Sequence, residues 1–204
     1  MPVPRSPGAR PSDDHLLDAA CAEFAESGFH ATTLAAVAHR ANSTKPTLYA
    51  HFGSKDALYA ALLEREAATC RTWLFEAYES AAGLGMRDQV SNDMSAFFDY
   101  AAKYPAGFRL LFAGDYTGTV VEVRQQLLAA IIEQIGRRLG DFNAAHTPIP
   151  EAVERQLAVM TVGVAVDAAR HAVADPHGDL DAACSVATAF VTAALGNFGA
   201  ELSR

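Results

Sequence analysis

The chain has 204 residues, of which 50% are hydrophobic and 20% are charged, and its formal net charge is −8. This length suits one large domain, or a small domain joined to a larger one, and the composition excludes a largely disordered chain. The negative net charge argues at first against a nucleic-acid partner, because such binding depends on cations that displace counterions from phosphates.

The cysteine pattern indicates a reducing compartment. The chain has three cysteines, which are far apart in the sequence: Cys21, Cys70 and Cys184. An odd, widely spaced set suggests neither a disulfide framework nor a zinc site, so we expect a cytoplasmic protein.

The N-terminal region predicts a disordered arm and then a helix. Residues 1–11 are rich in proline and carry no apolar segment of the kind found in signal peptides. A first helix is expected over about residues 13–27, and Gly28 is a typical stop signal. The side chains expected to face inward are Leu16, Leu17, Ala20 and Phe24.

Residues 33–58 predict two short helices joined by a tight turn, followed by the start of a longer helix. Thr33 is a suitable N-cap for the first short helix. Asn42 ends that helix, because asparagine tolerates the left-handed conformation that a sharp turn needs. Thr44 can then cap the second short helix, with Pro46 in its first turn. The apolar face of the first short helix consists of Leu34, Val37, Ala38 and Ala41.

The second short helix, residues 45–52, is expected to turn polar side chains outward. Leu48 and Phe52 fall on its buried side. The remaining positions carry groups that can bind phosphate oxygens and base edges: Lys45, Thr47, Tyr49 and His51.

The charge distribution along this segment answers the objection raised by the net charge. No acidic residue occurs between Glu26 and Asp56, whereas Arg40, Lys45 and Lys55 lie in or beside the two short helices. Because a nucleic acid meets the local field rather than the net charge, this segment remains a suitable binding surface.

The same segment resembles the helix-turn-helix of the tetracycline-repressor (TetR) family of transcription regulators. The positions that match the family pattern are Thr33, Val37-Ala38, Thr47-Leu48-Tyr49, His51-Phe52 and Lys55. The Tyr-x-His-Phe ending, joined to a long helix that begins at Ser54 or Lys55, is the most specific part. The chain departs from the pattern at these positions: Ala35, Ala36, Asn42 and Ser43.

The resemblance implies an all-α fold with two domains. It implies an N-terminal three-helix DNA-binding head with a helix-turn-helix over residues 12–54, and a C-terminal helical bundle for ligand binding and dimerisation over residues 55–204. The implied function is that of a DNA-binding transcriptional regulator, a repressor that a small apolar or amphipathic effector releases from a near-palindromic operator.

DNA contacts are expected from seven residues of this segment. Base or mixed contacts are expected from Lys45, Thr47 and Tyr49, and phosphate contacts from Thr33, Thr44, His51 and Lys55. Lys55 opens a helix whose N-terminal amides also favour an anion. Arg5 and Arg10 could reach the minor groove or a phosphate, although we favour a solvated tail.

The rest of the chain predicts helices separated by turn signals, without a strand pattern. We expect helices at about residues 55–80, 87–104, 105–113, 120–141, 150–174 and 180–202. Residues 182–200 carry no charge and approach the length of a bilayer-spanning helix. We reject that interpretation because alanine, threonine, serine and glycine dominate the run, and a helix buried in a protein interface explains it better.

The last two expected helices carry stripes of small residues. The stripes are Ala158, Thr161, Ala165, Ala168 and Ala172 in one helix and Ala183, Ala187 and Ala194, with Phe190 and Phe198, in the other. Small side chains let helices approach closely, so we expect a homodimer held by a four-helix interface. The alternative is that the stripes form an internal core face.

The middle helices are rich in aromatic residues, which as a group suggest a cavity for the effector. Ordinary core packing is the simpler interpretation of any single aromatic residue. The expected lining is Trp73, Met94, Phe97, Phe108, Phe112, Ile131, Met160 and Val164. Asp167, Arg170 and His171 could bind a polar end of the effector or pair with each other on the surface.

The residues also bear on two other classes of function. We find no metal-ligand spacing, nucleophile motif or glycine-rich phosphate loop, so neither an enzyme nor a cofactor is expected. A helical protein-interaction module with a vestigial DNA-binding head is the alternative, because Ala35, Ala36 and Ser43 weaken the head.

Overall fold

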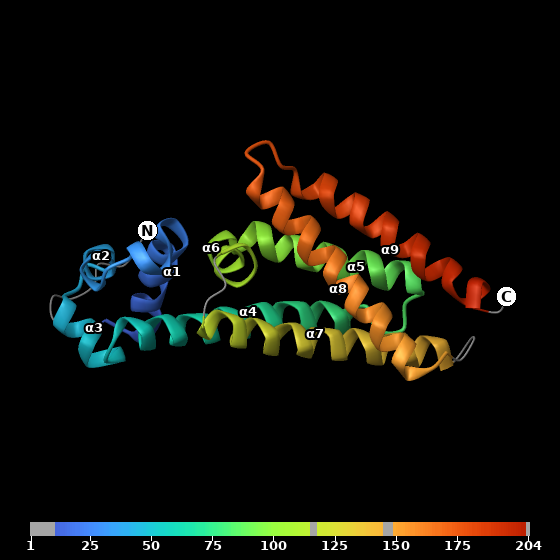
Figure 1. Ribbon diagram of the computed structural model, residues 1–204, viewed down its shortest axis with the longest axis horizontal. Coiled ribbons are helices and arrows are strands. Elements are labelled where there is room, and N and C mark those ends of the chain that lie inside the picture. Colours follow the sequence, from blue (N-terminus) through green and yellow to red (C-terminus); the bar gives the residue numbers. More distant parts are fainter. Residues whose placement is uncertain (1–10, 115–117, 145–148, 203–204) are drawn as a thin grey trace. The chain divides into compact units, whose positions relative to one another are not determined.

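The computed structural model describes residues 11–114, 118–144 and 149–202, apart from the side chains at 119, 143–144 and 197–202. Within these residues the chain forms helices and no strand (Figure 1). The expected arm with Arg5 and Arg10 falls almost wholly in residues 1–10, outside the described residues, as does the side chain of Phe198. The prediction of an all-α fold is confirmed.

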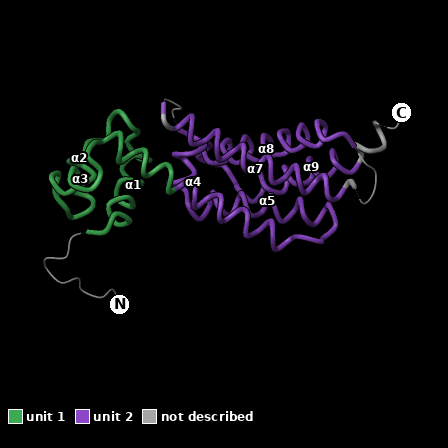
Figure 2. Tube along the Cα trace, turned by 90° about the horizontal axis from the view of Figure 1, so that it is seen from below, with its two compact units in different colours: residues 1–65 green, residues 66–204 purple. Residues whose placement is uncertain are grey.

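The chain divides into two compact units, residues 1–65 and 66–204 (Figure 2). The division falls inside helix α4 (Lys55–Ser80), later than the boundary expected before residue 55. The reason is that the start of α4 packs on the first unit. The ring of Tyr59 lies 4.7 Å from that of Phe24, and Arg65 pairs with Asp18 at 2.8 Å.

The first unit contains α1 (Asp13–Ala31), α2 (Leu34–Arg40), α3 (Lys45–Phe52) and the start of α4. Gly28 is the predicted end of the first helix, and it has non-helical angles (φ 76°, ψ 166°) that break α1 before a last turn to Ala31. The core of this unit consists of the buried side chains of Leu16, Ala20, Phe24, Val37, Leu48, Leu58 and Leu62. Most of them belong to the apolar faces predicted from helical spacing.

The second unit is a helical bundle. Its helices after α4 are α5 (Met86–Lys103), α6 (Pro105–Phe108), the π-helix η1 (Arg109–Ala113), α7 (Thr119–Ala144), α8 (Glu151–Ala174) and α9 (Leu180–Leu202). Helix α8 packs against α7 and α9, and α9 also packs against α5. The expected helix over residues 105–113 is thus a short α-helix that continues as a π-helix.

Helix α8 is long and apolar enough to cross a membrane by length and composition alone. Its apolar side chains Leu157, Val162 and Val166 are buried in the bundle, which accounts for that composition. In α9, the apolar stretch within the part with described side chains, Leu180–Gly196, is shorter than α8.

Candidate functional site

Two threonine caps and one asparagine shape the helix-turn-helix of the first unit. The Thr33 hydroxyl accepts a hydrogen bond from the Ala36 amide at 3.1 Å, and the Thr44 hydroxyl accepts one from the Thr47 amide at 3.3 Å. Asn42 has a φ of 46°, which is the left-handed conformation predicted for it. These contacts satisfy amides that would otherwise be unpaired at the start of α2 and α3.

The outer surface of α3 presents a lysine and a tyrosine together. Tyr49 is 49% exposed, and the Lys45 ammonium lies 5.7 Å from the centre of its ring. Thr47 is half-buried, and its hydroxyl is 2.8 Å from that of Thr44. The buried side of α3 is fixed by Leu48, which is 1% exposed.

Two of the residues expected to bind phosphate also hold the first unit together. His51 Nδ1 lies 2.5 Å from a carboxylate oxygen of Asp13. The Lys55 ammonium lies 4.5 Å from the centre of the Phe29 ring and donates to the His30 carbonyl at 3.4 Å. These contacts orient both side chains, and any phosphate would bind alongside or in place of them.

Arg40 is less available to DNA than the sequence suggests. Its guanidinium donates to Glu23 at 2.9 Å and forms two hydrogen bonds with Glu26. The hydrogen bond from Arg40 lowers the pKa of Glu26. Residues 27–55 contain no acidic residue, but in the folded structure the carboxylates of Glu23 and Glu26 from α1 neutralise the Arg40 cation.

The second unit contains two small adjoining cavities in the region expected to bind an effector. One, of about 20 Å³, is lined by Tyr78, Asp93, Met94, Phe97, Ile131, Ile135, Thr161, Val162, Ala165 and Val166. The other, of about 40 Å³, shares Asp93, Met94, Ile135 and Thr161 with it. Each is large enough for only about one or two water molecules.

The structure brings some of the expected lining residues together. Met94, Phe97 and Ile131 line the smaller cavity. Phe108 and Phe112 are fully buried next to it, with ring centres 5.9 Å and 5.5 Å from that of Phe97. These five residues form one apolar cluster from α5, α6, η1 and α7.

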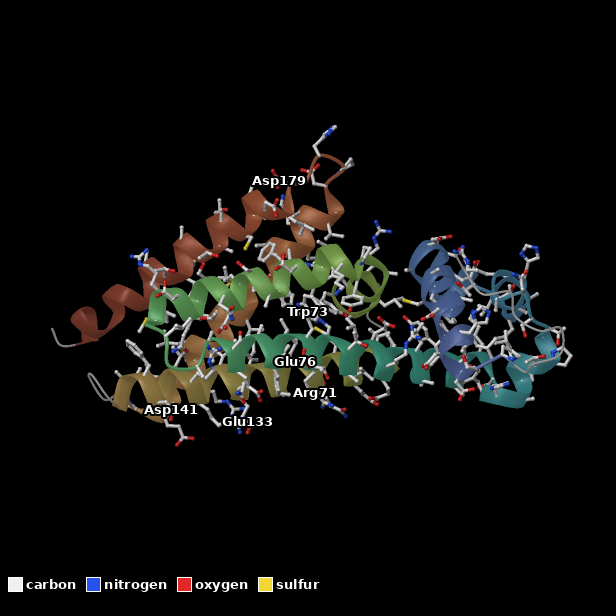
Figure 3. All side chains as sticks on the ribbon, turned by 180° about the vertical axis from the view of Figure 1, so that it is seen from behind. Arg71, Trp73, Glu76, Glu133, Asp141 and Asp179 are labelled. Carbon is white, nitrogen blue, oxygen red and sulfur yellow. The ribbon has the colours of Figure 1, made fainter. Side chains whose placement is uncertain are left out.

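Three other expected residues lie elsewhere. Met160 is 57% exposed on the outer face of α8. Val164 is half-buried on α8 and lines neither of these two cavities. Trp73 donates its indole N–H to the Ala96 carbonyl at 2.9 Å and lies on the α5 side of α4 in Figure 3. Helical spacing alone could not separate inner from outer positions on α8.

A larger hollow of about 620 Å³ lies between α7 and α8. Charged side chains contribute much of its lining: Glu133, Arg137, Glu151, Glu154 and Arg155. Glu133 points away from the bundle in Figure 3. Apolar side chains such as Leu128, Ile132 and Val159 form the rest of its wall, and it is far larger than the two cavities beside Met94.

Comparison with known proteins agrees with the helix-turn-helix geometry. Residues 16–62 match the model of a family described as bacterial regulatory proteins, tetR family. The chain is also 32% identical over 156 residues to the HTH-type transcriptional activator FasR of Mycolicibacterium smegmatis. The aligned region covers 76% of this chain and 69% of FasR. The chain belongs to the TetR family.

Solved TetR-family structures share the fold. A TetR-like regulator from Rhodococcus sp. RHA1 has a TM-score of 0.71 at 25% identity, covering 96% of this chain and 99% of that one. FadR of Bacillus subtilis, solved with stearoyl-CoA, has a TM-score of 0.75 at 15% identity, covering 88% and 97%. SmeT, the repressor of a Stenotrophomonas maltophilia efflux pump, has a TM-score of 0.72 at 21% identity, covering 91% and 90%. The family and fold are those of DNA-binding transcription regulators rather than of enzymes.

Sequence reasoning missed one polar feature of this TetR-family bundle. Arg138 of α7 donates to Asp93 of α5 at 2.5 Å and to Gln89 at 2.9 Å. All three residues line the larger inner cavity. Asp93 and Arg138 are 45 positions apart, so no local sequence pattern predicts the pair.

The polar residues that were considered as an effector anchor lie on the surface. Arg170 donates to Asp167 at 3.0 Å, and both side chains are well exposed, as is His171. This is the surface pairing that the sequence left as an alternative.

Proposed function

We propose that the chain is a cytoplasmic, homodimeric operator-binding regulator whose affinity for DNA is lowered by a small apolar or amphipathic effector. The observation that carries the proposal is the capped α3 helix, which buries Leu48 and leaves Lys45 and Tyr49 exposed. A helix held in this way can enter the major groove and place these side chains against base edges.

The proposed DNA contacts follow from this orientation. Lys45, Thr47 and Tyr49 are assigned to bases or to mixed contacts, and Thr33, Thr44, His51 and Lys55 to phosphates. Support comes from the exposure of Thr33, Thr44, Lys45 and Tyr49. Lys55 lies at the N-terminus of α4, and the dipole of this helix also favours binding of a DNA phosphate.

We place the dimer interface on the outer faces of α8 and α9. Four large apolar side chains are exposed there: Val159, Met160, Val186 and Phe190. Several members of the small-residue stripe expected at the interface, Ala158, Ala165, Ala172 and Ala187, are instead buried in the chain itself. The interface therefore depends on the opposite, exposed face of these helices.

Two symmetric heads would read a near-palindromic operator with half-sites roughly 34–36 Å apart or a multiple of that distance. The relative FasR is named an activator and the neighbour SmeT a repressor. We propose repression as the default output of this chain.

The proposed effector site is the pair of inner cavities. At about 40 and 20 Å³, they are far smaller than the few hundred cubic ångströms that a typical ligand site occupies. Binding would therefore have to separate α5, α7 and α8. Because Tyr78 of α4 also lines the smaller cavity, the expansion would move the helix that continues into the first unit.

The nature of the neighbours supports an amphipathic effector. FadR is described in complex with stearoyl-CoA, a long acyl chain with a polar head. The larger inner cavity offers both kinds of surface, because its mostly apolar wall also contains the ion pair of Asp93 and Arg138.

The test is selection of an operator from random duplexes, followed by fluorescence anisotropy with the selected duplex. Replacing Tyr49 and Lys55 together by alanine should weaken binding by at least about two orders of magnitude while leaving the dimer intact. Lys103→Ala, an exposed lysine of the second unit, serves as the matched control.

Operator binding that survives the double substitution would refute the assigned contacts. Failure of the unmodified chain to select any duplex, at low as well as moderate salt, would favour the protein-interaction module instead.

A further inference from the structure

An ion pair in the second unit is largely withdrawn from water. The side chains of Arg138 and Asp93 are only 14% and 17% exposed. The guanidinium also lies 5.1 Å from the centre of the Tyr78 ring and donates to Gln89. Arg138 is thus surrounded by partners from α4 and α5.

The rest of the cavity wall beside this pair is mostly apolar. Its principal side chains are Met86, Val90, Met94, Ile135, Leu139 and Leu195. Removing two charges from water is unfavourable, and the attraction between them seldom exceeds this penalty by much. Burial raises the pKa of Asp93, while Arg138 opposes that rise. An ion pair in such a wall is therefore a candidate for ligand recognition rather than for stability.

We propose that Arg138 binds the negatively charged head of an amphipathic effector, which replaces Asp93 as its partner while the tail lies along Met94, Ile135 and Leu139. The inference rests on the proposal that the inner cavities are the effector site, and it names the class of that effector. The planar guanidinium can hold a carboxylate or a phosphate through two parallel hydrogen bonds.

The ion pair also argues against the other classes of head group. A cationic head would meet the guanidinium and would have to displace it from Asp93. A neutral head would leave the pair intact and would gain only an ordinary hydrogen bond. An anionic head gains a charge-assisted contact, and the Asp93 carboxyl, which already favours its neutral form more than usual, can take up a proton.

The first test compares probes that share one tail. Isothermal titration calorimetry with dodecanoate, dodecyl phosphate, dodecanol and dodecyltrimethylammonium, all below their micellar concentrations, reports the preference for the head. We expect both anions to bind about tenfold more tightly than dodecanol, and the cation to bind least. A preference for dodecanol or for the cation would overturn the assignment.

The second test uses variants that act in opposite directions. Arg138→Met should abolish the preference for anions, whereas Asp93→Asn should strengthen anion binding because it removes the competing carboxylate. Both changes should alter the affinity for dodecanol much less, because a neutral head gains only an ordinary hydrogen bond there. Arg137→Met is the matched control, because Arg137 is exposed and pairs with Glu133 outside this cavity.

The outcomes separate this inference from the proposed function. If Arg138→Met does not fold, the affinity of Asp93→Asn for dodecanoate still decides, and an unchanged or weaker affinity contradicts the proposal. If the anions bind through Arg138 but leave operator affinity unchanged, operator release fails and the assignment of Arg138 stands. If no probe binds the unmodified chain, the assignment of Arg138 fails while operator binding is untouched.

Discussion

Asn42 lies between α2 and α3 with a φ of 46°, where most side chains are strained. Asparagine and glycine adopt this conformation more easily than other residues. We therefore expect Asn42→Ala to lower the free energy of unfolding by about 1 kcal/mol, measured by urea denaturation. Asn42→Gly is the control and should retain stability. Equal losses in both variants would mean that the side chain, rather than the backbone angle, matters here.

Gly107 of α6 lies against a buried carboxylate. A Cβ at this position would come within 2.2 Å of a carboxylate oxygen of Glu66 and 3.3 Å of the Tyr100 hydroxyl. Glu66 is 6% exposed and Tyr100 is fully buried, so neither side chain can move away freely. Gly107→Ala should therefore lower the free energy of unfolding by roughly 1–3 kcal/mol.

A matched glycine provides the control for that experiment. In α7, a Cβ on Gly136 would make only an ordinary contact, at 3.9 Å from Ala158. Gly136→Ala should raise the free energy of unfolding by about 0.5–1 kcal/mol, because alanine favours the helix. A similar gain at Gly107 would show that the Glu66 side chain adapts.

At the scale of the element, the recognition helix depends on its threonine cap. The Thr44 hydroxyl accepts from the Thr47 amide, so Thr44→Ala should lower the free energy of unfolding by about 1 kcal/mol. Operator affinity should fall with it, because the first turn of α3 also carries Lys45. Thr44→Ser keeps the acceptor and should restore both quantities, as measured by thermal unfolding and fluorescence anisotropy. Loss of affinity without loss of stability would mean that Thr44 acts on DNA alone.

The helix boundaries could be predicted because the signals that set them are local. Thr33 and Thr44 cap the next few residues, and Asn42 sets one backbone angle. The start of α4 at Lys55 was likewise predicted correctly. Contacts that join distant residues could not be predicted in this way. Arg40 forms ion pairs with Glu23 and Glu26, which precede it by 17 and 14 positions, so the neutralisation of its charge is visible only in the folded structure.

The same distinction explains what was predicted of the cavity. Phe97, Met94 and Ile131 face inward because an apolar stripe in a bundle helix usually faces the core. Met160 lies on α8, where apolar residues occupy both faces, and the sequence does not show which face is covered by a neighbour. The exposure of Met160 marks a surface that a second copy of the chain could cover.

At the scale of the whole molecule, the exposed face of α9 provides a test of the dimer. Phe190 is 63% exposed, and we expect it to be buried in the homodimer. Phe190→Glu should therefore yield a monomer in analytical ultracentrifugation and should weaken operator binding, since one head contacts a single half-site. Leu84→Glu is the control, because Leu84 is 47% exposed in the loop before α5. A dimer that persists in Phe190→Glu would move the interface away from this part of α9.

Operator and effector should oppose each other through the whole dimer. If filling the inner cavities moves α4, the effector binds best to a state in which the two heads no longer fit both half-sites. Linkage then requires that saturating effector weakens operator binding by the same factor by which saturating operator weakens effector binding. Anisotropy with labelled operator and calorimetry with dodecanoate measure the two factors separately. Unequal factors would show that the two measurements report different equilibria. If neither ligand changes the affinity for the other, the coupling is refuted, because an effector with no preference between the two states cannot shift their populations.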